Sequence, residues 1–451
     1  MNKYMQIAQD IEHKIIQGKL KPSSRLPSII ATSKKYHCAK GTVIKAYDSL
    51  LKKHLIYTKA QSGYYVANNL LLSKVDDTNI FDLRTGNPIV NNLSLENIKH
   101  CLNIASELYA KKSADIAISS VSDLHHCVCN FLATQSIYTK PANISMIQGI
   151  TQILTILSLM PFPNQKKKIL IEEPSFWNYI NFLKQSNIDV LTIKRDINGI
   201  DLKQLEYLFK TQDIKFFYCI TRNHNPLGTS LSYHQRKKIM ELALKYDVYI
   251  IEDDYFSESF KIPKYVPIHF FSYGKNCIYL QSSSKNFPFI RIGLAIIPDD
   301  LINTFNDMAE HLYYYSYHIP SLVSQAVFEA YIKSNIFENE NKIISNRLKE
   351  KLRLAQQICQ NWDPTIASLV GGKCGYYAMI KVNPKITIKK LVENLQAQGI
   401  LVKNNINAYY NIENFDNSIR ISFANVQKND LIKILDKIYL TICKQSKGEN
   451  T

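Results

Sequence analysis

Lys285 lies in a serine-rich turn, Ser282-Ser283-Ser284-Lys285, shortly after an apolar stretch that ends at Leu280. A lysine amine can form a Schiff base with an aldehyde cofactor, and neighbouring hydroxyls can hold a phosphate. Arg291, six residues further on, adds a guanidinium that pairs with phosphate oxygens. This spacing predicts a site for a phosphorylated aldehyde. A lysine beside serines is also common on solvated surfaces, so the prediction depends on the motifs that precede it.

Polar side chains also follow two apolar stretches upstream. Asp253 comes just after the stretch 248–251, and a carboxylate there can keep a pyridine nitrogen protonated, which turns the ring into an electron sink. Tyr255, two residues on, can donate a hydrogen bond to a phenolic oxygen of the same ring. Asn225 follows the other stretch, 216–220, and precedes a proline, which holds it extended so that its amide can face a ligand. Taken singly, each motif is also a common solvated turn.

Two further motifs could contact a flat, phosphorylated ligand. Gly149, before Ile150 and Thr151, lets the backbone N–H groups of a helix N-terminus approach a phosphate. Phe176 and Trp177 follow the apolar stretch 168–171, and one of these rings could stack on a planar ligand. Alternatively both rings belong to the core, which is the commoner place for an aromatic side chain.

The elements that must position these residues alternate along the chain. From residue 81 onward, helical stretches separate apolar strands at 168–171, 190–193, 216–220, 248–251, 277–280 and 294–297. This alternation predicts an α/β fold with a mostly parallel sheet covered by helices. Such sheets bind ligands at the carboxyl ends of their strands, where several of the motifs fall.

The N-terminal segment differs from the rest in charge. Residues 1–75 carry 13 lysines and arginines against 3 acids, a net charge of +10 out of +17 for the whole chain. Concentrated positive charge is typical of domains that bind the DNA backbone, although a lysine-rich proteome would also produce it. Apolar spacing predicts three helices here, followed by a hairpin. Ser28 can cap the second helix, and the third begins near Lys40.

This segment resembles a GntR-type winged helix. The resemblance is carried by Gly18-Lys19-Leu20-Lys21-Pro22, Arg25-Leu26-Pro27-Ser28, Gly41-Thr42-Val43 and Ser62-Gly63-Tyr64-Tyr65-Val66. It implies a winged helix-turn-helix domain over residues 1–67 that binds double-stranded DNA, followed by a linker at 68–80. The DNA-binding residues are expected to be Arg25, Ser28, Lys34, Lys40, Thr42, Lys45 and Gly63. A helical cap that dimerises without meeting DNA is the alternative.

The ordered motifs of the body resemble the site of fold-type I aminotransferases across roughly residues 80–440. With the winged helix, the whole chain resembles MocR-type regulators, in which an aminotransferase-like domain is fused to a GntR-type reader. The resemblance implies pyridoxal 5'-phosphate as cofactor and an aminotransferase-like domain over residues 81–451. We therefore expect helices on both faces of the sheet, a large subdomain at about 120–325 and a small C-terminal α+β subdomain at about 326–445.

The same resemblance assigns roles around the cofactor ring. Lys285 would be the catalytic residue, which forms the Schiff base. Asp253 would pair with the pyridine nitrogen, Asn225 and Tyr255 would donate hydrogen bonds to the phenolic oxygen, and Phe176 would stack on the ring.

The resemblance also assigns two sites for anions. Ser282, Arg291 and the backbone at Ile150 and Thr151 would bind the phosphate. Arg420, in the segment 419–424, matches the family arginine that takes the α-carboxylate of a substrate or effector, and a planar guanidinium suits that role. Without the resemblance, Arg420 is an arginine in a strand, exposed to solvent.

Three functions fit these residues. The first is a DNA-binding transcriptional regulator whose aminotransferase-like domain senses pyridoxal phosphate, an amino acid or an amine. The second is an active aminotransferase with a vestigial DNA-binding domain. The third is a DNA-binding scaffold without cofactor chemistry, suggested by an interval from Lys285 to Arg291 one residue shorter than in the family. Fold-type I sites are usually completed across a homodimer, and paired DNA half-sites suit the same symmetry.

The remaining composition indicates a cytoplasmic protein. Nine cysteines without framework spacing favour a reducing compartment. We expect no metal at the histidine–cysteine cluster 125–129, because its members do not share one face of the predicted helix. The sequence contains no apolar run long enough to span a membrane and no N-terminal leader, so no membrane association is expected.

Overall fold

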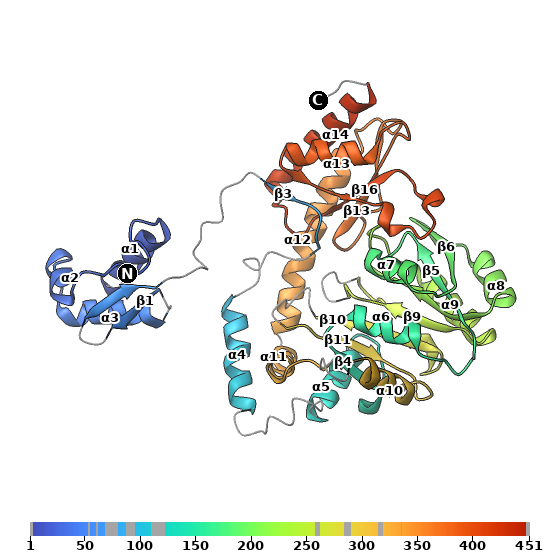
Figure 1. The fold of residues 1–451 in the computed structure, drawn as a ribbon, viewed down its shortest axis with the longest axis horizontal. Coiled ribbons are helices and arrows are strands. Elements are labelled where there is room, and N and C mark those ends of the chain that lie inside the picture. Colours follow the sequence, from blue (N-terminus) through green and yellow to red (C-terminus); the bar gives the residue numbers. More distant parts are fainter. Residues whose placement is uncertain are drawn as a thin grey trace. The chain divides into compact units, whose positions relative to one another are not determined.

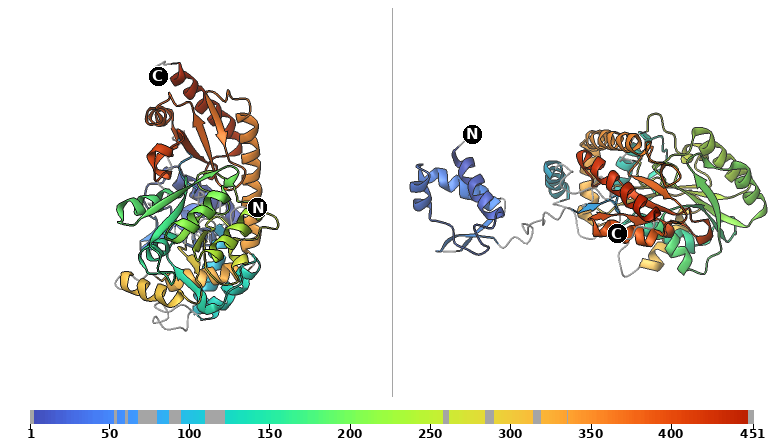
Figure 2. Two further views of the ribbon diagram at one scale, coloured as in Figure 1. Left: turned by 90° about the vertical axis from the view of Figure 1, so that its right-hand side faces the viewer. Right: turned by 90° about the horizontal axis from the view of Figure 1, so that it is seen from above.

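The chain divides into two units, Met1–Asn79 and Ile80–Thr451 (Figures 1 and 2). The computed structural model describes residues 3–52, 55–59, 62–67, 80–86, 95–109, 122–257, 262–283, 290–313, 319–334 and 336–447. Lys285 and the expected linker up to residue 79 lie outside these ranges. Within them, no helix is both long enough and apolar enough to cross a membrane, and no group of side chains could hold a metal ion.

The N-terminal unit consists of three helices and a hairpin, as the sequence predicts. Its elements are α1 (Lys3–Ile16), α2 (Ile29–Lys35), α3 (Lys40–Lys52), β1 (Ile56–Lys59) and β2 (Gly63–Val66). The apolar faces of α1 and α3 meet in its core, where Ile7, Ile11 and Val43 are buried. Ser28 caps α2, because its hydroxyl accepts a hydrogen bond from the Ala31 N–H at 3.2 Å.

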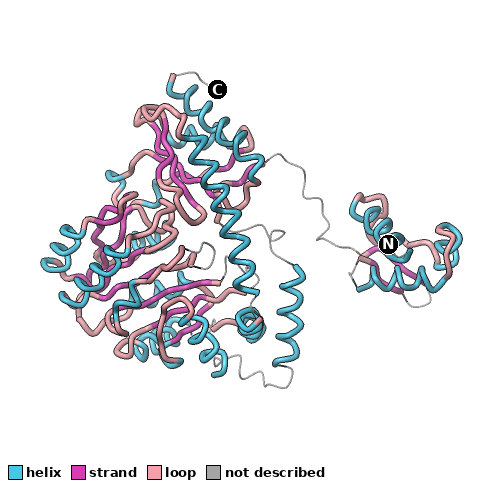
Figure 3. The backbone as a smooth tube through the Cα atoms, turned by 180° about the vertical axis from the view of Figure 1, so that it is seen from behind, coloured by secondary structure: helices cyan, strands magenta, loops and turns pink. Residues whose placement is uncertain are grey.

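The larger unit contains an eight-stranded sheet in the order β4-β11-β10-β9-β8-β5-β6-β7. Its strands are among those drawn in magenta in Figure 3, with helices beside them. Its strands are β4 (Ile144–Ile147), β5 (Lys168–Glu173), β6 (Val190–Asp196), β7 (Gly199–Ile200), β8 (Ile214–Cys219), β9 (Tyr249–Asp253), β10 (Cys277–Ser282) and β11 (Gly293–Ile296). The run from β10 to β6 is parallel, whereas β11 is antiparallel to both its neighbours. The expected mostly parallel sheet is therefore confirmed.

Helices cover both faces of this sheet. Successive residues of a strand point to opposite faces, and those of β5 pack against different sets of helices. Ile169 and Ile171 of β5 pack with α6 (Ile150–Leu159), α7 (Trp177–Gln185) and α10 (Ile302–Tyr313). Leu170, between them, packs with α8 (Leu202–Thr211) and α9 (Tyr233–Lys245). A third cluster joins α4 (Leu95–Tyr109), α5 (Ser122–Ala133) and α11 (Leu322–Lys333) to β4 and β11.

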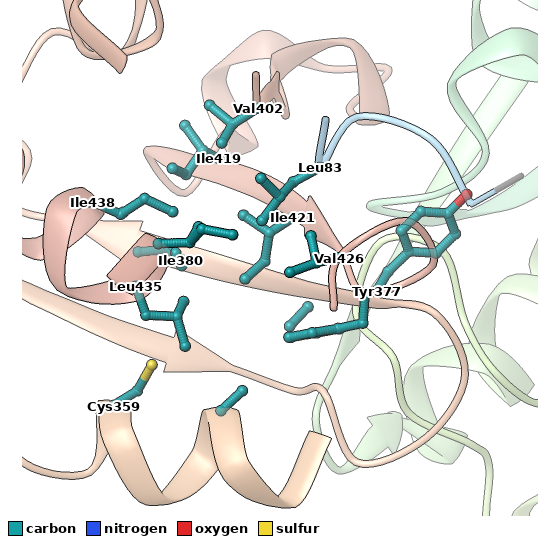
Figure 4. Packing of buried hydrophobic residues seen from close by; sticks show 14 of the residues in the cluster. Leu83, Cys359, Tyr377, Ile380, Val402, Ile419, Ile421, Val426, Leu435 and Ile438 are labelled. Atoms are coloured by element: carbon teal, nitrogen blue, oxygen red, sulfur yellow. The ribbon is translucent and has the colours of Figure 1, made fainter. Parts of the chain in front are cut away.

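The small C-terminal subdomain is built on a four-stranded antiparallel sheet in the order β12-β13-β16-β15. Its elements are α12 (Ile336–Cys359), β12 (Ala367–Val370), β13 (Tyr377–Val382), α13 (Ile388–Ala397), β15 (Lys403–Asn404), β16 (Ser418–Ser422) and α14 (Leu431–Ser446). Ile380 and Ile421 of the sheet contribute to the same buried core as Leu435 of α14 (Figure 4).

Residues 80–86 belong to this small subdomain. The sequence did not reveal that this early segment joins it. They include the two-residue strand β3 (Phe81–Asp82), which pairs in parallel with β14 (Ile400–Leu401). Leu83 follows β3 and is fully buried in the core shown in Figure 4. The first described residues of the larger unit are thus fixed to a strand more than 300 positions later in the chain.

Candidate functional site

A cavity of about 810 Å³ opens at the carboxyl ends of the parallel strands. Asp253 is the last residue of β9 and Ser282 the last of β10, and both line it. The structure brings all of the predicted cofactor and effector residues within its described ranges to this one cavity. These are Ile150, Thr151, Phe176, Asn225, Asp253, Tyr255, Ser282, Arg291 and Arg420. Only Lys285 of the predicted set lies outside the described residues.

Asp253 provides a buried carboxyl in this cavity. The Tyr218 hydroxyl donates a hydrogen bond to its Oδ2 at 2.5 Å, and the Tyr255 backbone N–H donates to its Oδ1 at 3.1 Å. Burial nevertheless raises the pKa of Asp253 to about 7, because the charged form is poorly solvated there. A cation beside this carboxyl, such as a protonated ring nitrogen, would stabilise the ionised form.

The raised pKa of Asp253 predicts how the stability of the cofactor-free protein depends on pH. The folded protein keeps this proton up to about pH 7, whereas the unfolded chain loses it near pH 4. The contribution to stability is therefore present below about pH 4 and is lost as the pH rises to about 7. Between about pH 4 and pH 7 the free energy of unfolding should therefore fall by up to about 4 kcal/mol less in Asp253→Asn than in the wild type. Urea unfolding across that pH range measures the difference.

Glu252 serves as an internal reference for that experiment. Burial also raises the pKa of Glu252 to about 7, so its contribution remains in both proteins. If the free energy of unfolding falls equally with pH in the wild type and in Asp253→Asn, the raised pKa of Asp253 is contradicted.

The start of α6 has the geometry of an anion site. Gly149 is the N-cap of this helix, and Ile150 and Thr151 form part of its first turn, whose N–H groups point away from the helix. Arg291 lies beside this turn, since a Cβ atom added to Gly149 would be 4.0 Å from its Nη2. Gly293 permits β11 to approach, because a Cβ there would be only 3.2 Å from the Ile150 nitrogen. The first turn and Arg291 together can hold a phosphate.

Ser282 and Tyr255 line the same end of the cavity. The Ser282 hydroxyl donates to the Ile292 carbonyl at 3.1 Å, so it must turn before it can donate to a phosphate as predicted. The side chains of Tyr255 and Ser282 are hydrogen-bonded to each other. Burial raises the pKa of Tyr255 to about 12, so its hydroxyl stays protonated. Because Ser282 donates its own proton to Ile292, the Tyr255 hydroxyl donates to Ser282 and must turn before it can donate to a ligand.

Arg420 reaches the cavity from β16. Contrary to its reading as a solvated strand arginine, it is buried, and burial lowers its pKa. Its Nη1 donates to Asn225 Oδ1 at 2.9 Å, its Nη2 donates to the Arg84 carbonyl, and its guanidinium lies 4.4 Å from the Tyr377 ring centroid. Both protein acceptors are neutral, so a carboxylate ligand would supply the missing counter-charge. Because Asn225 accepts through Oδ1, its two amide N–H groups remain for another partner.

A buried ion pair positions the loop that carries Asn225. Arg222 donates to both carboxylate oxygens of Asp254 at 2.6 Å, and the Tyr279 hydroxyl donates to the same carboxylate at 2.7 Å. Arg222 precedes Asn225 by three residues, and Asp254 follows Asp253. The pair therefore holds two cavity residues in a fixed relation. Sequence reasoning missed it, because Arg222 and Asp254 appear in the sequence as ordinary turn charges.

The cavity also contains charged residues that the sequence did not indicate. Asp82 and Arg84 come from the β3 segment, and Lys403 comes from β15. A two-residue strand leaves no periodic signal, so no sequence pattern could have placed them. With Arg291 and Arg420, the cations in the lining outnumber the two acids, Asp82 and Asp253. The cavity is thus suited to anionic ligands.

The predicted DNA-binding lysines lie on two helices of the N-terminal unit. Lys34 is in the last turn of α2, Lys40 is the first residue of α3 and Lys45 lies within α3. All three are exposed, whereas Thr42 is half-buried. Basic side chains on the second and third helices are where a helix-turn-helix meets DNA.

The remaining predicted DNA contacts lie beside the hairpin and at the start of α2. A Cβ atom added to Gly63 would be 3.6 Å from Nε and Nη2 of Arg25, and Gly63 has a φ of +106°, which strains any other residue. Arg25 is exposed and therefore free to reach a phosphate. Ser28 uses its hydroxyl as the cap of α2, which the sequence also predicted.

Two family models match the chain. The family "Aminotransferase class I and II" matches residues 79–438, and "Bacterial regulatory proteins, gntR family" matches residues 3–66. The chain is 32% identical to the HTH-type transcriptional regulator YcxD of Bacillus subtilis, over 96% of this chain and 98% of that protein. It is 25% identical to the HTH-type transcriptional regulator NorG of Staphylococcus aureus, over 93% of this chain and 100% of that protein.

Solved structures share the fold of the larger unit. A multiple substrate aminotransferase from Thermococcus profundus has a TM-score of 0.73 and 20% identity, over 83% of this chain and 93% of that one. An archaeal alanine:glyoxylate aminotransferase has a TM-score of 0.71 and 20% identity, over 93% of this chain and 96% of that one. At this identity the likeness bears on the fold alone.

Proposed function

This chain belongs to the aminotransferase class I and II family and carries a gntR-family domain, and we propose that its DNA binding responds to a ligand at its pyridoxal phosphate site. Pyridoxal phosphate is the cofactor of this family, and it supplies an aldehyde that reacts with amino groups. The described residues fit this molecule, because an anion site at α6 and a buried carboxyl at Asp253 line one cavity. We propose Lys285 as the residue that binds it covalently.

The ring would be held by four side chains. Asp253 would hold a proton on the ring nitrogen, and its burial strengthens that ion pair. Asn225 Nδ2 and the Tyr255 hydroxyl would donate to the phenolic oxygen. Phe176, half-buried in the cavity lining, would stack against the ring.

The two anionic groups would be held by different residues. Arg291, Ser282 and the N–H groups of Ile150 and Thr151 would bind the phosphate, where the positive end of the α6 dipole adds to the guanidinium. Arg420 would bind the carboxylate of an amino acid effector through two parallel hydrogen bonds. To do so, it must exchange its present acceptors for the ligand.

One observation carries the regulatory proposal: the first residues of the larger unit contact the effector arginine. Arg420 donates to the Arg84 carbonyl, and the Ser422 N–H donates to the Leu83 carbonyl at 2.8 Å. A carboxylate on Arg420 would therefore change the bonding of the segment that leads in sequence to the DNA-binding domain. An effector shifts such an equilibrium only if it binds one arrangement better. DNA affinity measured with and without an amino acid tests this.

We further propose a cytoplasmic homodimer on double-stranded DNA. All nine cysteines are free thiols, which suits a reducing compartment. Two copies of the N-terminal unit would contact two half-sites, because the symmetry of a dimer matches that of a palindromic site.

The exposed lysines of α2 and α3 are expected to contact DNA phosphates. Lys40→Ala and Lys45→Ala should each weaken binding to specific and non-specific duplexes alike, and should each lower the slope of log affinity against log salt concentration by about 1. Fluorescence anisotropy of a labelled duplex at several salt concentrations measures both quantities. Lys14→Ala is the control, because Lys14 lies on α1 and pairs with Asp10 at 2.6 Å. Equal slopes for Lys14→Ala, Lys40→Ala and Lys45→Ala would contradict this placement.

A working aminotransferase is the second candidate function. It is favoured by the cavity, which holds Asp253, Asn225 and Arg420 together as turnover would require. Formation of a keto acid from an added amino acid would identify it. Effector-dependent DNA binding without keto acid would favour the regulator, and DNA binding that ignores both cofactor and amino acid would favour a scaffold.

A further inference from the structure

Lys403 lies in the cavity but has no part in the roles proposed so far. It is on β15, directly opposite Arg420 of β16 in the antiparallel register. Residues directly opposite each other project to the same face of a sheet, so two cations share one wall. A void of about 10 Å³ is lined by Lys403, Arg420, Asn225 and Trp177, which shows that these four lie together. Like charges in this arrangement are unfavourable until an anion joins them.

Among the described residues, no acid neutralises either cation. Lys403 Nζ lies 4.5 Å from the centroid of the Trp177 ring, which gives it a π-face rather than a carboxylate. Asp82 is already paired, since Arg84 donates to its two oxygens at 3.0 and 2.9 Å. Burial, Arg420 and Arg84 together lower the pKa of Lys403, and no acid opposes them. The wall formed by Lys403 and Arg420 thus carries positive charge without a counterion in the protein.

The charges of the proposed ligands leave Lys403 as the cation that remains unmatched. The phosphate would occupy Arg291 and the start of α6, a ring cation would match Asp253, and an α-carboxylate would occupy Arg420. A ligand with a single carboxylate therefore leaves Lys403 without a partner. A second acidic group on the ligand would complete the balance.

We propose that Lys403 and the Trp177 ring form a second anion subsite, so that the effector is an amino acid with two carboxylates. This inference rests on the proposed function and names its ligand class. The α-carboxylate binds Arg420, and the side-chain carboxylate binds Lys403 across the same wall. The indole faces the Lys403 ammonium and excludes water from one side of the ion pair.

Isosteric amino acids test the subsite in the full chain loaded with pyridoxal phosphate. Glutamate against glutamine, and aspartate against asparagine, differ in charge but hardly in shape. The wild type should bind at least one acid about tenfold more tightly than its amide, as expected for one charge-assisted hydrogen bond. Lys403→Gln should abolish this preference, while Lys403→Arg should keep most of it. Lys381→Gln is the control, because Lys381 is an exposed lysine on β13 of the same sheet.

Tryptophan fluorescence gives a readout independent of turnover. The chain has two tryptophans, and Trp362→Phe leaves Trp177 as the only one, directly beneath Lys403. Equal affinity for acid and amide in both pairs, or a preference that survives Lys403→Gln, would overturn the subsite. If neutral amino acids bind and alter DNA affinity as well as acidic ones, the subsite fails while the proposed function stands. If the protein does not retain pyridoxal phosphate, the proposed function itself fails.

Discussion

Replacing Lys285 with alanine is expected to abolish the visible absorption band of the pyridoxal phosphate-loaded protein and its response to an amino acid. The reason is that Lys285 is the proposed covalent attachment point, three residues after Ser282, which lines the cavity. The non-covalent contacts at Arg291, Asp253 and α6 remain in the variant. We therefore expect weak, reversible cofactor binding without the band, measured by absorption after dialysis.

Two controls make the Lys285 experiment specific. Lys275→Ala removes an exposed lysine just before β10 and should keep the band. Basal DNA affinity should be unchanged in Lys285→Ala, because the N-terminal unit has its own core. Borohydride reduction followed by peptide mass spectrometry should place the cofactor on Lys285 in the wild type. Retention of the band in Lys285→Ala, or labelling of another lysine, would contradict this assignment.

Replacing Arg420 should give the second large effect. Arg420→Gln is expected to weaken binding of an amino acid effector at least about 30-fold, the cost of about 2 kcal/mol or more for losing one partner of a buried charge pair. The effector affinity of Arg420→Lys should lie between that of the wild type and that of Arg420→Gln, since an ammonium keeps the charge but not the paired geometry. Calorimetric titration of the pyridoxal phosphate-loaded protein measures these affinities.

The ligand itself provides the best control for Arg420. An alkylamine lacks a carboxylate, so its affinity should be nearly the same in the wild type and in Arg420→Gln. Arg353→Gln removes an exposed arginine of α12 and should leave the affinities for the amino acid and the alkylamine unchanged. An amino acid that binds Arg420→Gln as tightly as the wild type would show that its carboxylate lies elsewhere.

Local patterns were sufficient to predict much of the fold and the candidate residues. Ile7 and Ile11 share a helix face, Ser28 caps α2, and apolar strands alternate with helices, because each depends on near neighbours in sequence. Asp253 and Ser282 could be expected near each other, since the carboxyl ends of parallel strands meet at one edge of the sheet. The structure does place both in the cavity lining.

The rest depends on contacts between distant segments. Arg84 reaches the cavity because β3 pairs with β14. Only two residues of each strand pair, which is too short a stretch to leave a periodic pattern in the sequence. Lys403 faces Arg420 only through the register of β15 against β16. Arg222 and Asp254 form a buried pair whose members appear in the sequence as solvated charges. Burial, which sets the electrostatics of these residues, is a property of the packed fold.

The most direct test is the DNA affinity of the full chain loaded with pyridoxal phosphate, measured with and without glutamate. The probe is a duplex selected from random sequence by the protein itself, followed by fluorescence anisotropy. A ligand-linked change of about fivefold or more is expected in the wild type, as is usual for coupled sites, and none in Lys285→Ala or Arg420→Gln. If DNA affinity stays constant over all amino acids and amines tested, although the cofactor is bound, the domain does not control DNA binding through this site.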